Sequence, residues 1–239
     1  MLYFPNSNSR QELHLFEMSA NNFPAAVLWD MDGTLIDSEP YWLASESALA
    51  ESYGGTWTIE DGHEMIGKSL YDSSEMLRQK FGIEDLTVQQ VIDRMTDEVV
   101  SNLKRKLPFR PGALELLLEL KRRGIKTALV TMSMRKMALA VTEQIDFPAF
   151  DIVVAGDGVK FGKPHPEPYL KAAKLLGVEI TDCIAFEDSI SGLRSAEAAG
   201  THAIGIPNLI ELPKTSTNRI ISSLTEVDPD NLELLRVHG

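Results

Sequence analysis

Short apolar runs and amphipathic segments alternate along most of the chain. Five apolar runs lie at residues 25–29, 126–130, 151–155, 182–186 and 201–206. Helical periodicity covers residues 111–124, 133–145, 166–176 and 189–199, with Pro111 suited to a helix start and Gly124 to a helix end. Strands that alternate with helices in this way are typical of βαβ units. The pattern therefore predicts an α/β fold built on a parallel sheet.

The interval from residue 38 to residue 107 breaks this alternation. Helical periods cover residues 38–54, 69–82 and 87–106, but no convincing strand lies among them. We therefore expect a helical insertion at residues 38–107, and a core made of residues 24–37 and 108–239. Residues 1–23 are polar, rich in Asn and Ser, and without a sustained period, so they are expected to form an N-terminal extension.

Composition and charge narrow the possible functions. The 239 residues, 44% hydrophobic and 24% charged, are typical of a globular protein with one or two domains. A formal charge of −12 argues against nucleic acid and against an anionic membrane surface, because both favour clustered Lys and Arg. No apolar stretch approaches the ~20 residues of a membrane span. The single cysteine, Cys183, lies in an apolar run and indicates a reduced, cytoplasmic setting. Separately, we expect a monomer rather than an oligomer.

Polar side chains follow the predicted strands. In an open parallel sheet, ligands bind at the carboxyl ends of the strands, so residues there are the candidates for chemistry. Carboxylates gathered at this edge would repel each other unless a cation lay between them, and their hard oxygen atoms suit Mg²⁺. Because Mg²⁺ commonly bridges to phosphate oxygens and Lys163 belongs to the same edge, we expect a phosphate ligand. The candidates are Asp30, Asp32, Thr131, Ser133, Asp157, Glu187 and Asp188.

Each of these signals has a simpler interpretation on its own. Asp-Gly after a strand is often only a turn, and Glu187 with Asp188 would also suit the start of the following helix. An EF-hand is excluded because its glycine is the sixth residue of the loop, whereas Gly33 is the fourth. A P-loop is excluded because Pro164 follows Lys163 where Ser or Thr is required. Only the joint placement of the acids favours a site.

Four ordered segments carry a resemblance to a known family. They read "DMDGTLIDSEP", "LVTMS", "GKPHPEPY" and "IAFEDSISGLRSAEAAG". In order and spacing they resemble the four motifs of the haloacid dehalogenase-like (HAD) superfamily, in its branch with a small helical cap inserted after the first motif. The resemblance covers Ala25 to about Pro207. It implies a Rossmann-like parallel sheet with helices on both faces, and a cap at about residues 38–107.

The resemblance also implies roles for the residues that would act on the phosphate. Asp30 is similar to the nucleophile that attacks phosphorus and becomes an aspartyl phosphate. Asp32 is similar to the general acid and base, which protonates the leaving alkoxide and later activates water. Thr131 and Ser133 fall in the motif that binds the phosphoryl group, and Lys163 matches the cation that neutralises it.

A metal site follows from the same resemblance. Asp188 matches the Mg²⁺ ligand of the fourth motif, and Glu187 matches a ligand or a partner that acts through water. Asp30 belongs to the same set, and Asp32 is expected to contribute its backbone carbonyl. The physical reason is general, because a carboxylate and a phosphate ester repel each other until cations cancel their charges.

The predicted cap is expected to supply specificity. Residues in a cap close over the substrate and exclude water from the reacting centre. "MIGKSLYDS" falls where related enzymes place a loop that faces the active site, so Gly67, Lys68 and Ser69 are candidates for substrate contacts. An ordinary turn between two cap helices is the alternative interpretation.

The departures from the pattern indicate which reaction to expect. Dehalogenases of the superfamily lack the second aspartate, so Asp32 favours phosphoryl transfer. The related sugar phosphomutases carry a histidine and an arginine in the cap where this chain has Trp42 and Leu70. We therefore expect a Mg²⁺-dependent phosphatase that acts on a small phosphorylated sugar or polyol. The alternatives are a β-phosphoglucomutase-type mutase and a non-catalytic binding module, although the latter would be expected to have lost one of the motif residues.

Overall fold

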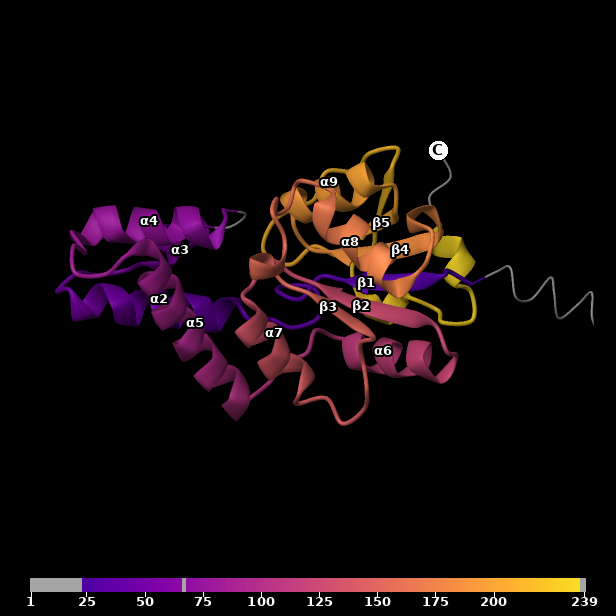
Figure 1. The fold of residues 1–239 in the computed structure, drawn as a ribbon, viewed down its shortest axis with the longest axis horizontal. Helices are drawn as coiled ribbons and strands as arrows, with labels where there is room; N and C mark the ends of the chain where they lie inside the picture. Colours follow the sequence, from indigo (N-terminus) through magenta and orange to yellow (C-terminus); the bar gives the residue numbers. More distant parts are fainter. Residues whose placement is uncertain (1–22, 66–67, 237–239) are drawn as a thin grey trace, which may run out of the picture.

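A six-stranded parallel sheet forms the core of the larger part of the molecule (Figure 1). The computed structural model describes residues 23–65 and 68–236. The strands follow the order β3-β2-β1-β4-β5-β6, and every neighbouring pair is parallel. Their bounds are β1 Ala26–Trp29, β2 Lys126–Val130, β3 Ile152–Val154, β4 Cys183–Glu187, β5 His202–Gly205 and β6 Asn218–Ile220. The α/β fold with a parallel, Rossmann-like sheet is confirmed.

Helices cover both faces of this sheet. On one face α6 (Ala113–Arg122) and α7 (Arg135–Thr142) pack on Val27 and Trp29 of β1. On the other face α8 (Glu167–Leu176) and α9 (Ile190–Ala199) pack on Ala26 and Leu28. Successive side chains of a strand point to opposite faces, so a strand buried on both sides is a continuous apolar run rather than an alternating one. Short 3-10 helices complete this part of the chain at η1 Gly156–Gly158, η2 Ile180–Asp182, η3 Leu224–Glu226 and η4 Leu232–Leu235.

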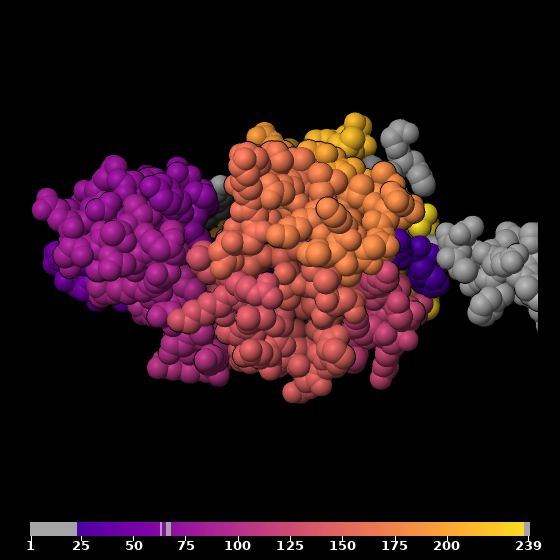
Figure 2. Space-filling view, in the orientation of Figure 1, coloured from indigo at the N-terminus to yellow at the C-terminus, as the bar shows by residue number. Residues whose placement is uncertain are grey.

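Four helices between β1 and α6 make up what we call the helical lobe, which has a hydrophobic cluster of its own. They are α2 Glu39–Ser52, α3 Ile59–His63, α4 Leu70–Phe81 and α5 Val88–Arg105. Leu49, Leu77 and Met95 are among its buried residues, and α5 also reaches the core of the sheet through Val99 and Leu103. Figure 2 shows the helical lobe beside the remainder of the molecule, which we call the sheet lobe.

Two antiparallel chain segments join the lobes. Ile36 forms an isolated bridge with Phe109, and the Asp37 N–H donates to the Pro108 carbonyl over 2.8 Å. The Arg110 N–H donates in turn to the Leu35 carbonyl over 2.9 Å. The chain therefore leaves the sheet lobe and returns to it at adjacent points.

Besides the short 3-10 helices, the structure has one α-helix and one strand that the sequence pattern did not predict, α3 and β6. It also moves one boundary, because Phe23, expected in the N-terminal extension, packs against the core and accepts a hydrogen bond from Arg236 at its carbonyl. The rest of that extension, residues 1–22, lies outside the described residues. Within the described part of the chain, no helix is long and apolar enough to cross a membrane.

Candidate active site

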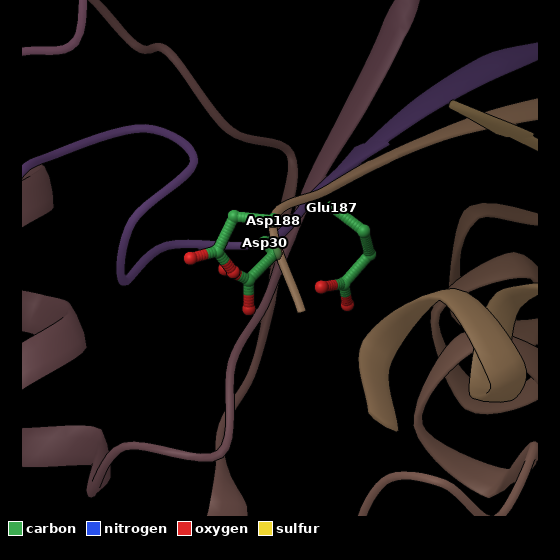
Figure 3. Close-up of side chains that lie close together, drawn as sticks. All are labelled: Asp30, Glu187 and Asp188. Atoms are coloured by element: carbon green, nitrogen blue, oxygen red, sulfur yellow. The ribbon is translucent and has the colours of Figure 1, made fainter. Parts of the chain in front are cut away.

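Three carboxylates gather where β1 and β4 end. Asp30 follows β1 directly, Glu187 is the last residue of β4, and Asp188 comes next. Pairing of β1 with β4 puts these ends side by side, and the Asp30 N–H donates to the Phe186 carbonyl over 3.0 Å. One oxygen atom from each carboxylate lies within 4.8 Å of the others (Figure 3). The expected convergence of acids at this edge is therefore seen for these three residues.

Lys163 supplies a buried positive charge to this cluster. Its Nζ lies 2.6 Å from Asp30 Oδ1 and 2.6 Å from Glu187 Oε1, and it donates to the Val130 carbonyl over 2.8 Å. Burial by itself would lower the pKa of Lys163, but the charges of Asp30 and Glu187 outweigh that effect and hold the pKa above its ordinary value. The ammonium group is therefore fixed in its charged form beside Asp30.

The acids still outnumber the cation. Burial raises the pKa of Asp30 to about 8, opposed by Lys163 and reinforced by Glu187 and Asp32. Burial, reinforced by the charges of Asp30 and Glu187, holds the pKa of Asp188 well above its usual range. Three close carboxylates with one ammonium group leave an excess of negative charge, and their oxygen atoms are the donors that Mg²⁺ prefers. The residues present thus fit a divalent cation.

Two glycines allow the acids to approach this closely. A Cβ on Gly33, which has a φ of 81°, would lie 1.9 Å from Asp188 Oδ2. A Cβ on Gly192, in the first turn of α9, would lie 1.8 Å from Glu187 Oε2. Glycine is therefore required at both positions for the observed carboxylate geometry.

The side chain of Asp32 lies outside the carboxylate cluster and is held by four donors. Its Oδ1 accepts from Ser38 Oγ over 2.6 Å and from Trp42 Nε1 over 3.4 Å. Its Oδ2 accepts from Ser133 Oγ over 2.7 Å and from Thr131 Oγ1 over 3.1 Å. The two lobes thus share the positioning of Asp32, because Ser38 and Trp42 belong to the start of α2 while the other donors follow β2.

A cavity of about 510 Å³ opens over these residues. The sheet lobe contributes Asp30, Asp32, Ser133, Lys163 and Asp188 to its lining. The helical lobe contributes both polar and apolar groups, among them Trp42, Glu46, Lys68, Ser69, Ile92 and Met95. The cavity is large enough for a small metabolite and is lined from both lobes.

Some residues expected at the site lie differently from the expectation. Thr131 is fully buried and its hydroxyl faces Asp32, so its contact with substrate stays a prediction. Glu187 is also fully buried, behind Lys163 and Tyr169, whose hydroxyl donates to it. Asp157 lines the cavity but is not part of the acid cluster, because it accepts from the Arg135 N–H at the start of α7. Lys68 and Ser69 line the cavity, while Gly67 lies outside the described residues.

Several residues that contact or line the site were not among the sequence candidates. Ser38 and Trp42 bind Asp32, Tyr169 binds Glu187, and Glu46 lines the cavity from α2. Ser38, Trp42 and Glu46 recur every four residues, which puts them on one face of a helix. That spacing was the sequence signal for the three residues of this helix face, whereas no sequence feature near Tyr169 indicated that it contacts Glu187.

A family model for haloacid dehalogenase-like hydrolases matches residues 24–200 of the chain. The chain belongs to this family. A phosphorylated carbohydrates phosphatase of Thermotoga maritima is 34% identical over 180 residues, which cover 75% of this chain and 83% of that protein. Hexitol phosphatase A of Escherichia coli is 31% identical, with 84% and 91% covered. A solved β-phosphoglucomutase of Clostridium difficile shares the family fold with a TM-score of 0.73 and 23% identity, and the match covers 90% of this chain and all of that one.

Proposed function

We propose that the chain is a Mg²⁺-dependent phosphatase that hydrolyses a small phosphorylated sugar or polyol through an aspartyl phosphate on Asp30. The observation that carries this proposal is the cluster of Asp30, Glu187 and Asp188, in which the Lys163 ammonium group contacts both Asp30 and Glu187 and Asp30 lines a cavity. Membership of the hydrolase family and the phosphatase relatives support the same reaction class.

The proposed reaction has two steps. A carboxylate oxygen of Asp30 attacks phosphorus, the ester P–O bond breaks, and Asp32 gives its proton to the leaving alkoxide. Asp32 then takes a proton from water as that water attacks the aspartyl phosphate, which releases inorganic phosphate and restores Asp30. Lys163 offsets the charge of the phosphoryl group, and the four donors around Asp32 hold it in position for both proton transfers.

A divalent cation is part of this proposal. Asp30 and Asp188 would hold it by carboxylate oxygen atoms, Asp32 by its backbone carbonyl, and Glu187 directly or through water. Bound there, Mg²⁺ supplies positive charge that reduces repulsion between the phosphate ester and the acidic cluster. The excess of carboxylates over cations at the site supports this assignment.

The mutase is the second candidate function, because it uses the same chemistry at Asp30. A mutase must retain a bisphosphate intermediate, and an arginine in the cap can bind the second phosphate bidentately. Leu70, which occupies that position, begins α4 and lines the cavity without any donor in its side chain. Trp42 uses its indole N–H on Asp32. Both observations favour hydrolysis, and the presence of Asp30, Asp32, Lys163 and Asp188 disfavours a non-catalytic module.

The test is a phosphate-release screen with the purified full chain across sugar, polyol and nucleotide monophosphates, with and without Mg²⁺. We expect release that requires Mg²⁺ and is fastest on a sugar or polyol phosphate. Phosphorus NMR on β-glucose 1-phosphate with a trace of the 1,6-bisphosphate separates the two candidates. Rapid conversion to glucose 6-phosphate without free phosphate would identify a mutase. A cytoplasmic location and a monomeric state stay predictions, and sedimentation would test the second.

A further inference from the structure

Glu46 lines the cavity from the second turn of the helix that holds Asp32. It lies on α2, four residues beyond Trp42 and eight beyond Ser38, both of which donate to Asp32. With a rise of about 1.5 Å per residue, Glu46 lies roughly 6 Å farther along the helix axis than Trp42. It is only 7% exposed. A substrate whose phosphate sits at Asp30 would therefore extend toward Glu46.

The carboxyl group of Glu46 has unused hydrogen-bonding capacity. Trp57 Nε1 donates to its Oε2 over 2.8 Å, and within the described residues this is its one hydrogen bond. It forms no ion pair with the described lysines and arginines. Burial raises the pKa of Glu46 to about 7, against a lowering by the Trp57 hydrogen bond and with a smaller rise from Glu39. A carboxylate offers about four acceptor positions, so most of its capacity stays available to a ligand.

The surroundings make Glu46 an unusual choice for a purely structural role. Trp42, Ile92 and Met95 also line the cavity and give it apolar surface, beside which an acid is costly to bury. A hydrogen-bond partner for the Trp57 indole N–H does not by itself explain an acid at this position. The fold tolerates a buried indole N–H without a partner, since the Nε1 of Trp29 has none among the described residues. A buried acid with a perturbed pKa in a cavity wall is characteristic of a binding or catalytic group.

We propose that Glu46 is a specificity-determining residue that accepts hydrogen bonds from hydroxyl groups at the end of the substrate remote from its phosphate. This inference rests on the proposed phosphatase function. The acidic side chain of Glu46 favours hydroxyl groups over a second phosphate at this position, because a carboxylate accepts from hydroxyl groups and repels a phosphate. Lys68 is the one lysine or arginine that the described part of the helical lobe contributes to the lining. The selected substrate is therefore a polyhydroxylated monophosphate.

The test compares a long polyol phosphate with a substrate that has no hydroxyl chain. The full chain with Mg²⁺ is assayed on sorbitol 6-phosphate and on p-nitrophenyl phosphate, as wild type, Glu46→Gln and Glu51→Gln. Glu51 is the matched control because it is exposed on the same helix. In Glu46→Gln the carboxamide oxygen can still accept from Trp57, but the NH₂ group cannot accept from a hydroxyl. We expect the ratio of kcat/KM values, sorbitol 6-phosphate to p-nitrophenyl phosphate, to fall about 10–100-fold through KM.

The outcomes separate this inference from the proposed function. In Glu51→Gln the ratio should stay within about twofold of wild type, which is the spread expected for a remote exposed charge. An unchanged ratio in Glu46→Gln, or an equal loss on both substrates, would overturn the role of Glu46 while leaving the phosphatase intact. A wild type that strongly prefers a sugar bisphosphate would also overturn it. If the wild type releases no phosphate from either substrate, the proposed function itself is wrong.

Discussion

The carboxylate of Asp30 contacts a buried ammonium group and faces two further acids, so one substitution there tests the proposed chemistry. Asp30→Asn keeps the size of the side chain and removes the carboxylate oxygen that is proposed as the nucleophile. We expect phosphate release to fall by at least about 10³-fold, because no covalent intermediate can form. Release from p-nitrophenyl phosphate measures it, with circular dichroism as the check on folding.

The matched control for Asp30 is the exposed Asp146, which lies in the loop after α7. Asp146→Asn removes the same charge from the chain and should leave the rate within about twofold of wild type, as for other remote surface changes. An Asp30→Asn protein with activity within tenfold of wild type would rule out the nucleophile.

Glu46 gives a second prediction at the residue scale, one that concerns stability rather than rate. Its pKa is about 7 when folded, against an ordinary value of 4.5. The folded protein therefore holds this proton more tightly than the unfolded chain, so stability is complete below pH 4.5 and decreases as the pH rises through about 7. Glu46→Gln removes that loss. We expect it to raise the free energy of unfolding by roughly 1–3 kcal/mol at pH 8 and to change it little at pH 4.5.

Urea denaturation of wild type and variant at the two pH values measures this difference. Glu51→Gln should show no such pH dependence, because Glu51 is exposed. If Glu46→Gln leaves the free energy of unfolding at pH 8 unchanged, Glu46 is charged in the folded state without a cost in stability.

At the scale of elements, hydrophobic patterning predicted the elements that bury a whole face. The apolar run at residues 126–130 coincides with β2, and the helical period at residues 87–106 contains α5. The two missed elements are short. β6 has three residues at the edge of the sheet, with Arg219 exposed between its ends. α3 has five residues and depends on a capping box between Thr58 and Asp61. Neither is long enough to give a period.

The prediction for a single element concerns Gly192 in the first turn of α9. Alanine is favoured over glycine in a helix by about 1 kcal/mol, which would make Gly192→Ala stabilising. A Cβ at this position would however lie 1.8 Å from Glu187 Oε2. We expect the clash with Glu187 to outweigh the gain in helix propensity. The variant should lose about 1–3 kcal/mol in free energy of unfolding and need a higher Mg²⁺ concentration for half-maximal rate.

Gly158→Ala is the comparison for that substitution, because nothing lies within 4 Å of a Cβ built there. It should change neither the denaturation midpoint nor the Mg²⁺ dependence. If Gly192→Ala is as stable and as active as wild type, Glu187 can move without consequence and its position is not critical.

At the scale of the whole molecule, a cation that binds the folded chain and not the unfolded one must raise its stability. Mg²⁺ at 100 times its dissociation constant should add about 2.7 kcal/mol. We expect the thermal midpoint of wild type to rise with Mg²⁺, and that of Asp188→Asn to respond much less. Differential scanning calorimetry measures this without any substrate. Asp146→Asn should respond as wild type does, and an equal response in Asp188→Asn would remove Asp188 from the metal site.

The candidate site was predictable from sequence where it depends on the shared edge of parallel strands. Asp30 and Asp188 follow two apolar runs, and the pairing of those strands brings them together. The two donors from α2 were not predicted: the spacing of Ser38 and Trp42 puts them on one face of a helix, but that they reach Asp32 follows only from the packing of α2 over the sheet lobe. Glu46 was missed because no local sequence feature distinguishes a buried acid from an exposed one on an amphipathic helix. Its burial follows from the packing of α3 and α5 against α2.

The two segments that join the lobes are paired with each other through Ile36 and Phe109. Because residues 38–107 leave the sheet lobe and return to it at one place, their length and shape have little effect on the folding of the sheet lobe. The entropic cost of bringing the two ends of such an insertion together grows only slowly with its length. A different insertion could replace residues 38–107 if it brought its own donors to Asp32 in place of Ser38 and Trp42. Under the proposed function, recognition and reaction can then evolve separately: new substrates are gained by exchange of the inserted residues, while the chemistry proposed at Asp30 is inherited unchanged.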